Sequence, residues 1–235
     1  MTSYKVIVRN SPNWREHKAA TLGVSVISPN WQGNKFAAIL QFAAANFKTI
    51  RIDVTDALYR HGFMVEGMEE KQALAHANSL GALWLTDNAD VIAASPVKPI
   101  IVRWAGWYRH PDYQKTLSDF WNAYNINPVL KNAVHDDIMD FYRRKGCEPS
   151  SREYEGSRDY FIEELAVSCL QGRELPSVKI YPGDELRCFH IVRNGLIPEA
   201  PHGLENEQFA KIKFGKRSTT PDSLNKSFLV GFSLA

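Results

Sequence analysis

The stretch LGVSVISPNWQGNKFAAILQFAAANF, residues 22–47, passes from an apolar run that stops at Ser25, through a loop rich in turn-forming residues, into an amphipathic segment. Between residues 34 and 47 the apolar side chains recur with the i, i+3, i+4, i+7 spacing of one helix face, at Phe36, Ile39, Leu40, Ala43 and Phe47. We therefore predict a buried strand that ends near Ser25 and a helix whose apolar face packs on a sheet.

The same alternation of strand and helix patterns continues along the chain. Short β-branched runs predict buried strands at residues 4–8, 21–26, 49–54 and 98–104. Apolar periodicity predicts helices at about 68–85, from residue 111, from Pro128 and over 151–170. Gly172 and Pro176 are typical helix stop signals after the last of these. Strand-like composition also marks residues 178–182, 186–191, 209–214 and 228–235. This order predicts an α/β fold with a doubly wound parallel sheet, in which ligands bind beyond the carboxyl ends of the strands.

Composition limits the class of protein. A chain of 235 residues with 44% hydrophobic content is large enough to bury one core, and we expect a single domain over residues 1–235. The formal net charge of +2 permits an RNA ligand but does not argue for one. Three widely spaced cysteines favour neither a disulfide framework nor a CxxC metal site. No apolar run approaches the roughly 20 residues of a membrane span. We expect a soluble cytoplasmic protein with no metal and no membrane partner.

Taken alone, Ser25 is more often a small residue tolerated at a strand end than a functional group. A nucleophile elbow requires G-x-S-x-G, and GVSVI places Ile27 where the second glycine belongs. The basic run FGKRST resembles a P-loop only faintly, because Ala210 replaces a glycine and Arg217 replaces the hydroxyl residue. The sequence also contains no G-x-G-x-x-G. These departures disfavour an α/β-hydrolase and any ATP or nicotinamide chemistry, and we expect no cofactor.

A second candidate pair lies in the stretch RDYFIEEL. Tyr160 and Glu164 are four residues apart and therefore share one helix face. Such a pair is commonly part of a solvated surface. If the face lines a pocket instead, the phenol and the carboxylate would bind an α-ammonium group, and Glu164 would accept its proton.

The order of these pieces resembles the cyclodipeptide synthases, which make diketopiperazines from two aminoacyl-tRNAs. That family has a G-(V/I)-S strand end and an LQ(W/F)A helix core, matched here by GVS at 23–25 and LQFA at 40–43. Its i, i+4 tyrosine and glutamate match Tyr160 and Glu164, and its PEY resembles PDY ending at Tyr113. Its C-terminal CYH or YP signature resembles CFH at 188–190. The resemblance spans most of residues 20–192.

The resemblance implies a Rossmann-like catalytic domain similar to those of the class I tyrosyl- and tryptophanyl-tRNA synthetases. It implies that Ser25 is a covalent nucleophile, that Tyr160 and Glu164 hold and deprotonate the amine, and that Tyr113 lines the site. The substrates would be two aminoacyl-tRNAs. Because these are already activated esters, no ATP site is needed. We expect the chain to act as a monomer.

Three departures from the family pattern affect this assignment. Phe189 stands where the family usually has a tyrosine, so the role of that hydroxyl in moving a proton is vacant or passes to His190. Ser28 stands where one branch has asparagine. The stretch VEGMEEKQALAHANSLGALWL is nearly acidic, whereas many members carry a strongly basic helix for tRNA. The RNA surface would then include either Arg103, Arg109 and Lys115 or Arg143, Arg144 and Lys145.

This divergence is similar to that of the fungal synthases that use arginine. In that case one substrate would be arginyl-tRNA, and Glu163 or Asp159 would pair with its guanidinium. Two alternatives stay open. One is a catalytically silent module that binds an aminoacyl end or a small metabolite, which Phe189 favours. The other is an unrelated Rossmann-like transferase in which Ser25 only donates a hydrogen bond to a ligand.

Overall fold

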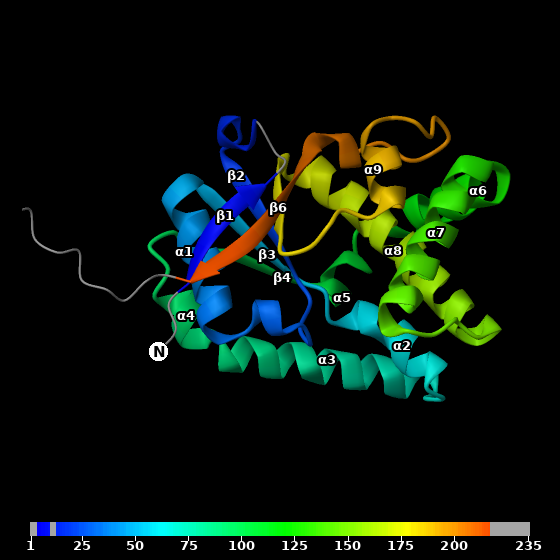
Figure 1. Ribbon diagram of the computed structural model, residues 1–235, viewed down its shortest axis with the longest axis horizontal. Coiled ribbons are helices and arrows are strands. Elements are labelled where there is room, and N and C mark those ends of the chain that lie inside the picture. Colours follow the sequence, from blue (N-terminus) through cyan, green and yellow to red (C-terminus); the bar gives the residue numbers. More distant parts are fainter. Residues whose placement is uncertain (1–3, 10–12, 217–235) are drawn as a thin grey trace, which may run out of the picture.

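The computed structural model describes residues 4–9 and 13–216, and its centre is a six-stranded sheet in the order β1-β6-β5-β2-β3-β4 (Figure 1). The strands are β1 Tyr4–Arg9, β2 Ala19–Val24, β3 Thr49–Val54, β4 Ile100–Arg103, β5 Ser177–Tyr181 and β6 Glu207–Lys216. Strand β1 pairs antiparallel with β6, and the other neighbouring pairs are parallel. The α/β fold with a mostly parallel sheet is confirmed.

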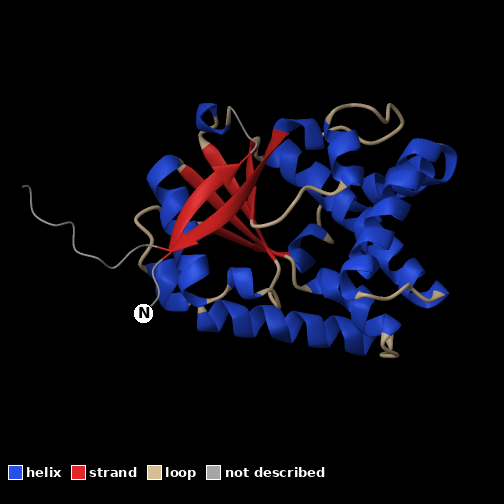
Figure 2. Ribbon diagram, viewed as in Figure 1, coloured by secondary structure: helices blue, strands red, loops and turns tan. Residues whose placement is uncertain are grey.

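Helices cover both faces of this sheet and extend beyond one end of it (Figure 2). The α-helices are α1 Gly33–Asn46, α2 Arg60–Val65, α3 Glu70–Asp87, α4 Ala89–Ala93, α5 Trp104–Trp107, α6 Tyr113–Ile126, α7 Pro128–Lys145, α8 Ser151–Glu174 and α9 Arg187–Arg193. Short 3-10 helices are η1 Trp14–Glu16, η2 Pro29–Trp31, η3 Ala57–Tyr59 and η4 Leu204–Asn206. None of the helices within the described ranges has the length and apolarity to cross a membrane.

Helix α1 packs on the sheet with the apolar face that its sequence periodicity predicts. Phe36, Ile39, Leu40 and Ala43 are buried in one core with alternating side chains of β2, β3 and β5, such as Leu22. Successive strand residues point to opposite faces, so the intervening residues must face the other layer. The strand register therefore assigns Ser25, just beyond β2, to the face opposite α1.

That opposite face is polar although it is buried. Its side chains are Thr21, Arg51, Asp53, Ser177, Lys179 and Glu207. They are held by one another and by α8: the hydroxyls of Thr21 and Ser177 are 2.7 Å apart, and the Arg51 guanidinium donates to the carbonyl of Gln171 at 3.3 Å. Helix α8 thus covers a layer of polar groups, and this layer leads to the carboxyl ends of the strands.

Helix α8 is longer than the sequence signals suggest. It begins with a capping box between Ser150 and Glu153 and runs through Gly172 to Glu174. A Cβ atom at Gly172 would lie 2.1 Å from the carbonyl oxygen of Gly203. The glycine therefore serves close packing of α8 against the segment before η4, and the expectation that it ends the helix near residue 170 is wrong.

Two strand predictions also need correction. Residues 186–191, expected as a strand, are helical from Arg187 on and belong to α9, because the carboxylate of Asp137 accepts hydrogen bonds from the backbone N–H groups of Arg187 and Cys188 at 3.0 and 2.9 Å. Strand β4 is an edge strand rather than a buried one, and its Ile100 side chain is 53% exposed. The predicted strand at 228–235 lies outside the described residues.

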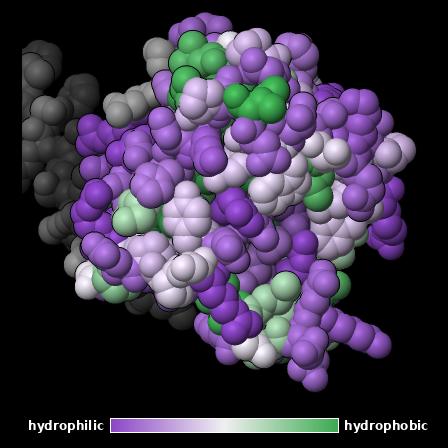
Figure 3. Space-filling view, turned by 90° about the vertical axis from the view of Figure 1, so that its right-hand side faces the viewer, coloured by the Kyte–Doolittle hydropathy of each residue, from purple (hydrophilic) through white to green (hydrophobic). Residues whose placement is uncertain are grey.

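A second core joins α6, α7, α8 and α9 beside the sheet. Its centre includes Phe120, Leu130, Ile138, Leu165 and Val192, all buried. The outer face of this helical part is largely hydrophilic, with scattered hydrophobic side chains (Figure 3). Helix α8 belongs both to this core and to the sheet layer, so it fixes the helical part at the carboxyl ends of the strands.

Candidate active site

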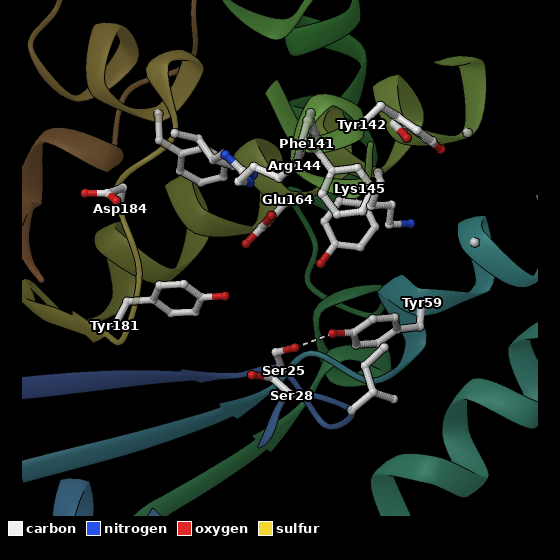
Figure 4. A pocket seen from close by; sticks show the side chains of 18 of the residues that line it. Ser25, Ser28, Tyr59, Phe141, Tyr142, Arg144, Lys145, Glu164, Tyr181 and Asp184 are labelled. Atoms are coloured by element: carbon white, nitrogen blue, oxygen red, sulfur yellow. Dashed lines mark hydrogen bonds between the residues drawn. The ribbon is translucent and has the colours of Figure 1, made fainter. Parts of the chain in front are cut away.

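A cavity of about 730 Å³ opens at the carboxyl ends of β2 and β5, between the sheet and helices α2, α7, α8 and α9. Its lining includes Ser25, Tyr59, Tyr160, Glu164 and Tyr181 (Figure 4). These residues come from a strand end, from η3, from the middle of α8 and from the end of β5. The end of a parallel sheet is where α/β folds bind ligands.

The hydroxyl groups of Ser25 and Tyr59 share a hydrogen bond at the floor of the cavity (Figure 4). Tyr59 also packs edge-on against Tyr160, with ring centroids 6.3 Å apart. Burial raises the pKa of the Tyr59 phenol, the hydrogen bond with Ser25 opposes this, and the charge of Glu164 adds to the rise. Tyr59 is therefore neutral near pH 7 and orients the serine hydroxyl as a hydrogen-bond partner.

The position of Tyr59 depends on the carboxylate of Asp56 at the start of η3. This carboxylate accepts from the backbone N–H of Ala57 at 2.8 Å and from Nε of Arg103 at 2.7 Å. Gly81 of α3 leaves the space, since a Cβ atom there would lie 2.0 Å from Oδ2 of Asp56. Packing of α3 against η3 thus holds the segment that carries Tyr59.

Glu164 points into the cavity from α8, opposite Ser25 (Figure 4). Burial raises the pKa of its carboxyl group, and the charge of Lys179 offsets part of the rise. Burial and the charge of Glu164 also raise the pKa values of the Tyr160 and Tyr181 phenols. The cavity therefore offers a buried carboxyl group that holds a proton more tightly than an exposed one, beside three neutral phenols.

Ser28 also lines the cavity, at the start of η2. Its backbone N–H donates to the carbonyl of Ser25 at 3.0 Å, and its hydroxyl accepts from the N–H of Asn30 at 3.4 Å. These bonds fix the turn that follows Ser25.

Glu163, by contrast, faces away from the cavity. Its carboxylate accepts from the Arg60 guanidinium at 2.9 and 2.5 Å, from the Trp104 indole at 2.9 Å and from the Tyr108 hydroxyl at 2.9 Å, and it pairs with His61 at 2.9 Å. Burial alone would raise its pKa, but the bonds from His61 and Arg60 lower it to about 2. Glu163 anchors α2 to α8, and the structure does not bring it to the cavity.

The other residues predicted from the sequence lie in different places. Phe189 is buried and lines the cavity, whereas His190 is exposed beside Glu185 at 3.3 Å. Asp159 pairs with Arg158 at 2.7 Å, and the buried ring of Tyr113 packs against Tyr108 with centroids 5.2 Å apart. His190, Asp159 and Tyr113 are thus outside the cavity lining.

The two groups of basic residues considered for RNA binding also differ in whether they reach the cavity. Arg103 is held by Asp56 and by the Asn78 carbonyl, and Lys115 pairs with Asp119 at 2.6 Å. Arg144 and Lys145, at the end of α7, line the cavity (Figure 4).

No protein-family profile matches the sequence, and no curated protein sequence matches it either. Solved structures do match. A cyclodipeptide synthase from Fluoribacter dumoffii superposes with a TM-score of 0.81 at 24% identity, covering 92% of this chain and 100% of the other. The chain has the cyclodipeptide-synthase fold.

Two further structures are consistent with this fold. The cyclodipeptide synthase from Candidatus Glomeribacter gigasporarum bound to Phe-tRNAPhe gives a TM-score of 0.65 at 14% identity, covering 90% of this chain and 93% of the other. Tyrosyl-tRNA synthetase from Archaeoglobus fulgidus gives 0.51 at 13% identity, covering 85% of this chain and 56% of the other. The predicted likeness to class I aminoacyl-tRNA synthetase domains is confirmed for the fold.

A tyrosine that was not selected from the sequence also reaches the cavity. Tyr181, at the end of β5, places its hydroxyl in the cavity opposite Tyr59 (Figure 4). The sequence reads YP at 181–182, the second form of the signature that was assigned to CFH. The strand-end position was the available signal, and it also marks Tyr59, which follows β3.

Proposed function

We propose that this protein is a cyclodipeptide synthase, which joins two aminoacyl groups from aminoacyl-tRNAs into a diketopiperazine through an aminoacyl-Ser25 intermediate. One observation carries the proposal: Ser25, directly after β2, shares a hydrogen bond with Tyr59 and lines one cavity with Tyr160 and Glu164. The cyclodipeptide-synthase fold supports the assignment.

In the first step, Oγ of Ser25 attacks the ester carbon of one aminoacyl-tRNA. The bond from that carbon to the ribose oxygen breaks, and the serine proton passes to this oxygen as the tRNA leaves. Tyr59 orients the serine hydroxyl for the attack. The product is an ester between the amino acid and Ser25, which splits the overall reaction into easier steps.

In the second step, the amine of the aminoacyl-serine attacks the ester carbon of the second aminoacyl-tRNA. A peptide bond forms, the second tRNA leaves, and the dipeptide remains on Ser25. The free amine of the dipeptide then attacks the serine ester. The six-membered ring closes and Ser25 recovers its proton.

Each amine must lose a proton before it attacks. Glu164 binds the α-ammonium group together with Tyr160 and takes this proton. Its raised pKa suits the role, because a carboxyl group of ordinary pKa would hold the proton too weakly near pH 7.

The identity of the substrates belongs to the same proposal. Arginyl-tRNA is one candidate, by similarity to the fungal arginine-using branch. Since Glu163 and Asp159 lie outside the cavity, a guanidinium would have to meet another carboxylate, and Glu66 beyond the end of α2 is among the lining residues. The alternative of a catalytically silent binding module was favoured by Phe189, which lacks a hydroxyl. Because Tyr181 supplies a phenol to the same cavity, Phe189 no longer favours that alternative.

The test is mass spectrometry of extracts from cells that express the chain, with a search across all diketopiperazine masses. Ser25→Ala is the inactive variant. Ser118→Ala is the matched control, since Ser118 is an exposed serine on α6 and is not among the residues that line the cavity. We expect a cyclic dipeptide with the wild type and the control but not with Ser25→Ala. A soluble wild-type protein that yields no such product with a full set of charged tRNAs would refute the proposal.

A further inference from the structure

Lys179 is a buried lysine for which the steps above have no role. It lies on β5, two residues before Tyr181, and lines the deep side of the cavity. Its Nζ donates to Oγ of Ser168 at 3.2 Å and lies 5.2 Å from the centroid of the Phe189 ring. The side chain crosses Gly23, where an added Cβ atom would be 3.5 Å from Cε. Residues of β2, α8 and α9 therefore hold the ammonium group in one place.

Burying an ammonium group is unfavourable unless an opposite charge accompanies it. Ser168 offers only a neutral hydroxyl, and among the described residues it is the only hydrogen-bond partner of Nζ. Ser168 follows Glu164 by one helical turn, so the two side chains share the same face of α8. Two buried carboxyl groups feel the charge of Lys179: Asp53 on β3, which Arg51 already pairs at 2.8 Å, and Glu164, which has no such partner among the described residues. Glu164 is therefore the counter-charge that Lys179 can serve.

The groups around Glu164 support this pairing. Tyr160 on its own helix, Tyr59 on η3 and Tyr181 on β5 are neutral phenols, and Cys188 on α9 is a neutral thiol whose pKa burial raises. Among the described residues, Lys179 is the cation whose charge lowers the pKa of Glu164, against the larger effect of burial.

We propose that Lys179 is a positioning residue for Glu164, which keeps this carboxyl group ionised and directed into the cavity until the ammonium group of a substrate arrives. The inference rests on the proposed function, because that function gives Glu164 its task. Without Lys179, burial would leave Glu164 protonated at a higher pH. A protonated carboxyl group neither attracts an ammonium group nor accepts its proton.

A direct test follows the ionisation of Glu164 itself. The protein is labelled with ¹³C at the side-chain carboxyl carbon of glutamate, and the Glu164 signal is assigned from its absence in Glu164→Gln. We expect the titration midpoint of this signal to move to higher pH in Lys179→Met and to stay near that of the wild type in Lys179→Arg. An unchanged midpoint in Lys179→Met would overturn the inference. If Lys179→Met does not fold, Lys179→Gln serves in its place.

A second measurement gives the functional consequence. In Lys179→Met, kcat/KM for diketopiperazine formation should fall mainly at acidic pH. The decrease relative to the wild type should be about tenfold greater at pH 6 than at pH 8.5. Lys48→Met removes the charge of an exposed lysine before β3 and should leave the profile unchanged. A loss equal at all pH values would indicate a purely structural role for Lys179 and contradict the inference. If the wild type forms no diketopiperazine, the proposed function fails, while the NMR titration still decides whether Lys179 controls Glu164.

Discussion

The hydrogen bond between Ser25 and Tyr59 depends on one hydroxyl oxygen of each residue. A serine hydroxyl alone has three staggered rotamers, and only some of them direct Oγ toward a substrate. The phenol of Tyr59 selects among these rotamers, since the two hydroxyls share a hydrogen bond. Tyr59 itself is held by η3 and by the ring of Tyr160. The orientation of one hydroxyl thus depends on two other elements.

Tyr59→Phe should therefore lower kcat by about tenfold, because orientation of the nucleophile is lost while its chemistry remains. The melting temperature should change little, since the aromatic ring stays in place. Rates of aminoacyl-enzyme formation, measured with labelled aminoacyl-tRNA in a single turnover, check this prediction. A variant with an unchanged single-turnover rate would show that Tyr59 does not orient Ser25.

Single residues also show what a local pattern can predict. Ser25, Tyr160 and Glu164 stand out because a strand end and an i, i+4 helix pair are local patterns, and the structure places all three in one cavity. Tyr181, the last residue of β5, and Tyr59, in η3 after β3, were not selected from the sequence, because a lone tyrosine near a strand end is too common a signal to single out a site. Glu163 was assigned to the substrate, and only the structure reveals its partners Arg60 and His61, about a hundred residues earlier.

At the scale of elements, the unexpected feature is the polar layer between the sheet and α8. Sequence patterns predicted four buried strands, and β2 and β3 are buried on both faces, but only the face toward α1 is apolar. The pattern of residues 186–191 predicted a strand because the carboxylate that accepts hydrogen bonds from the first turn of α9 belongs to Asp137, some fifty residues away in sequence. Such distant partners leave no trace in local periodicity, which explains why α9 was assigned wrongly.

The polar layer predicts an unusual pH dependence of stability. Burial raises the pKa of Asp53 from 3.8 to about 6, although Arg51 at 2.8 Å opposes this. A carboxyl group whose folded pKa is raised stabilises the protein fully below the unfolded value, and this contribution is lost as the pH rises through the folded value. Between pH 4 and pH 7 the wild type should therefore lose about 2 kcal/mol of unfolding free energy from this residue.

Asp53→Asn is the variant that isolates this contribution, because an amide of the same shape does not titrate. Urea unfolding at several pH values measures the difference in free energy of unfolding between the wild type and the variant. We expect this difference to decrease as the pH rises from 4 to 7. A difference that increases with pH would mean that the Arg51 ion pair outweighs burial and that Asp53 is ionised throughout.

At the scale of the whole molecule, the distribution of charge determines how an RNA substrate would be held. The formal net charge is only +2, and α3 carries the acidic side chains Glu70 and Asp87 at its two ends. The basic run Arg143, Arg144 and Lys145 ends α7, where it also complements the helix dipole. Because Arg144 and Lys145 line the cavity, the proposed function predicts that these two side chains contact the phosphate backbone of the tRNA substrate.

Replacing both Arg144 and Lys145 by Gln should therefore raise the KM for aminoacyl-tRNA with a smaller effect on kcat. Each phosphate contact that is lost removes about one unit from the slope of log affinity against log salt, so the double variant should reduce that slope by about two. Lys131→Gln is the control, since Lys131 is exposed near the other end of the same helix and does not line the cavity. Binding measured between 50 and 200 mM salt, as is usual for such slopes, checks both expectations. A slope that is the same in the double variant and the wild type would place the RNA on another face of the molecule.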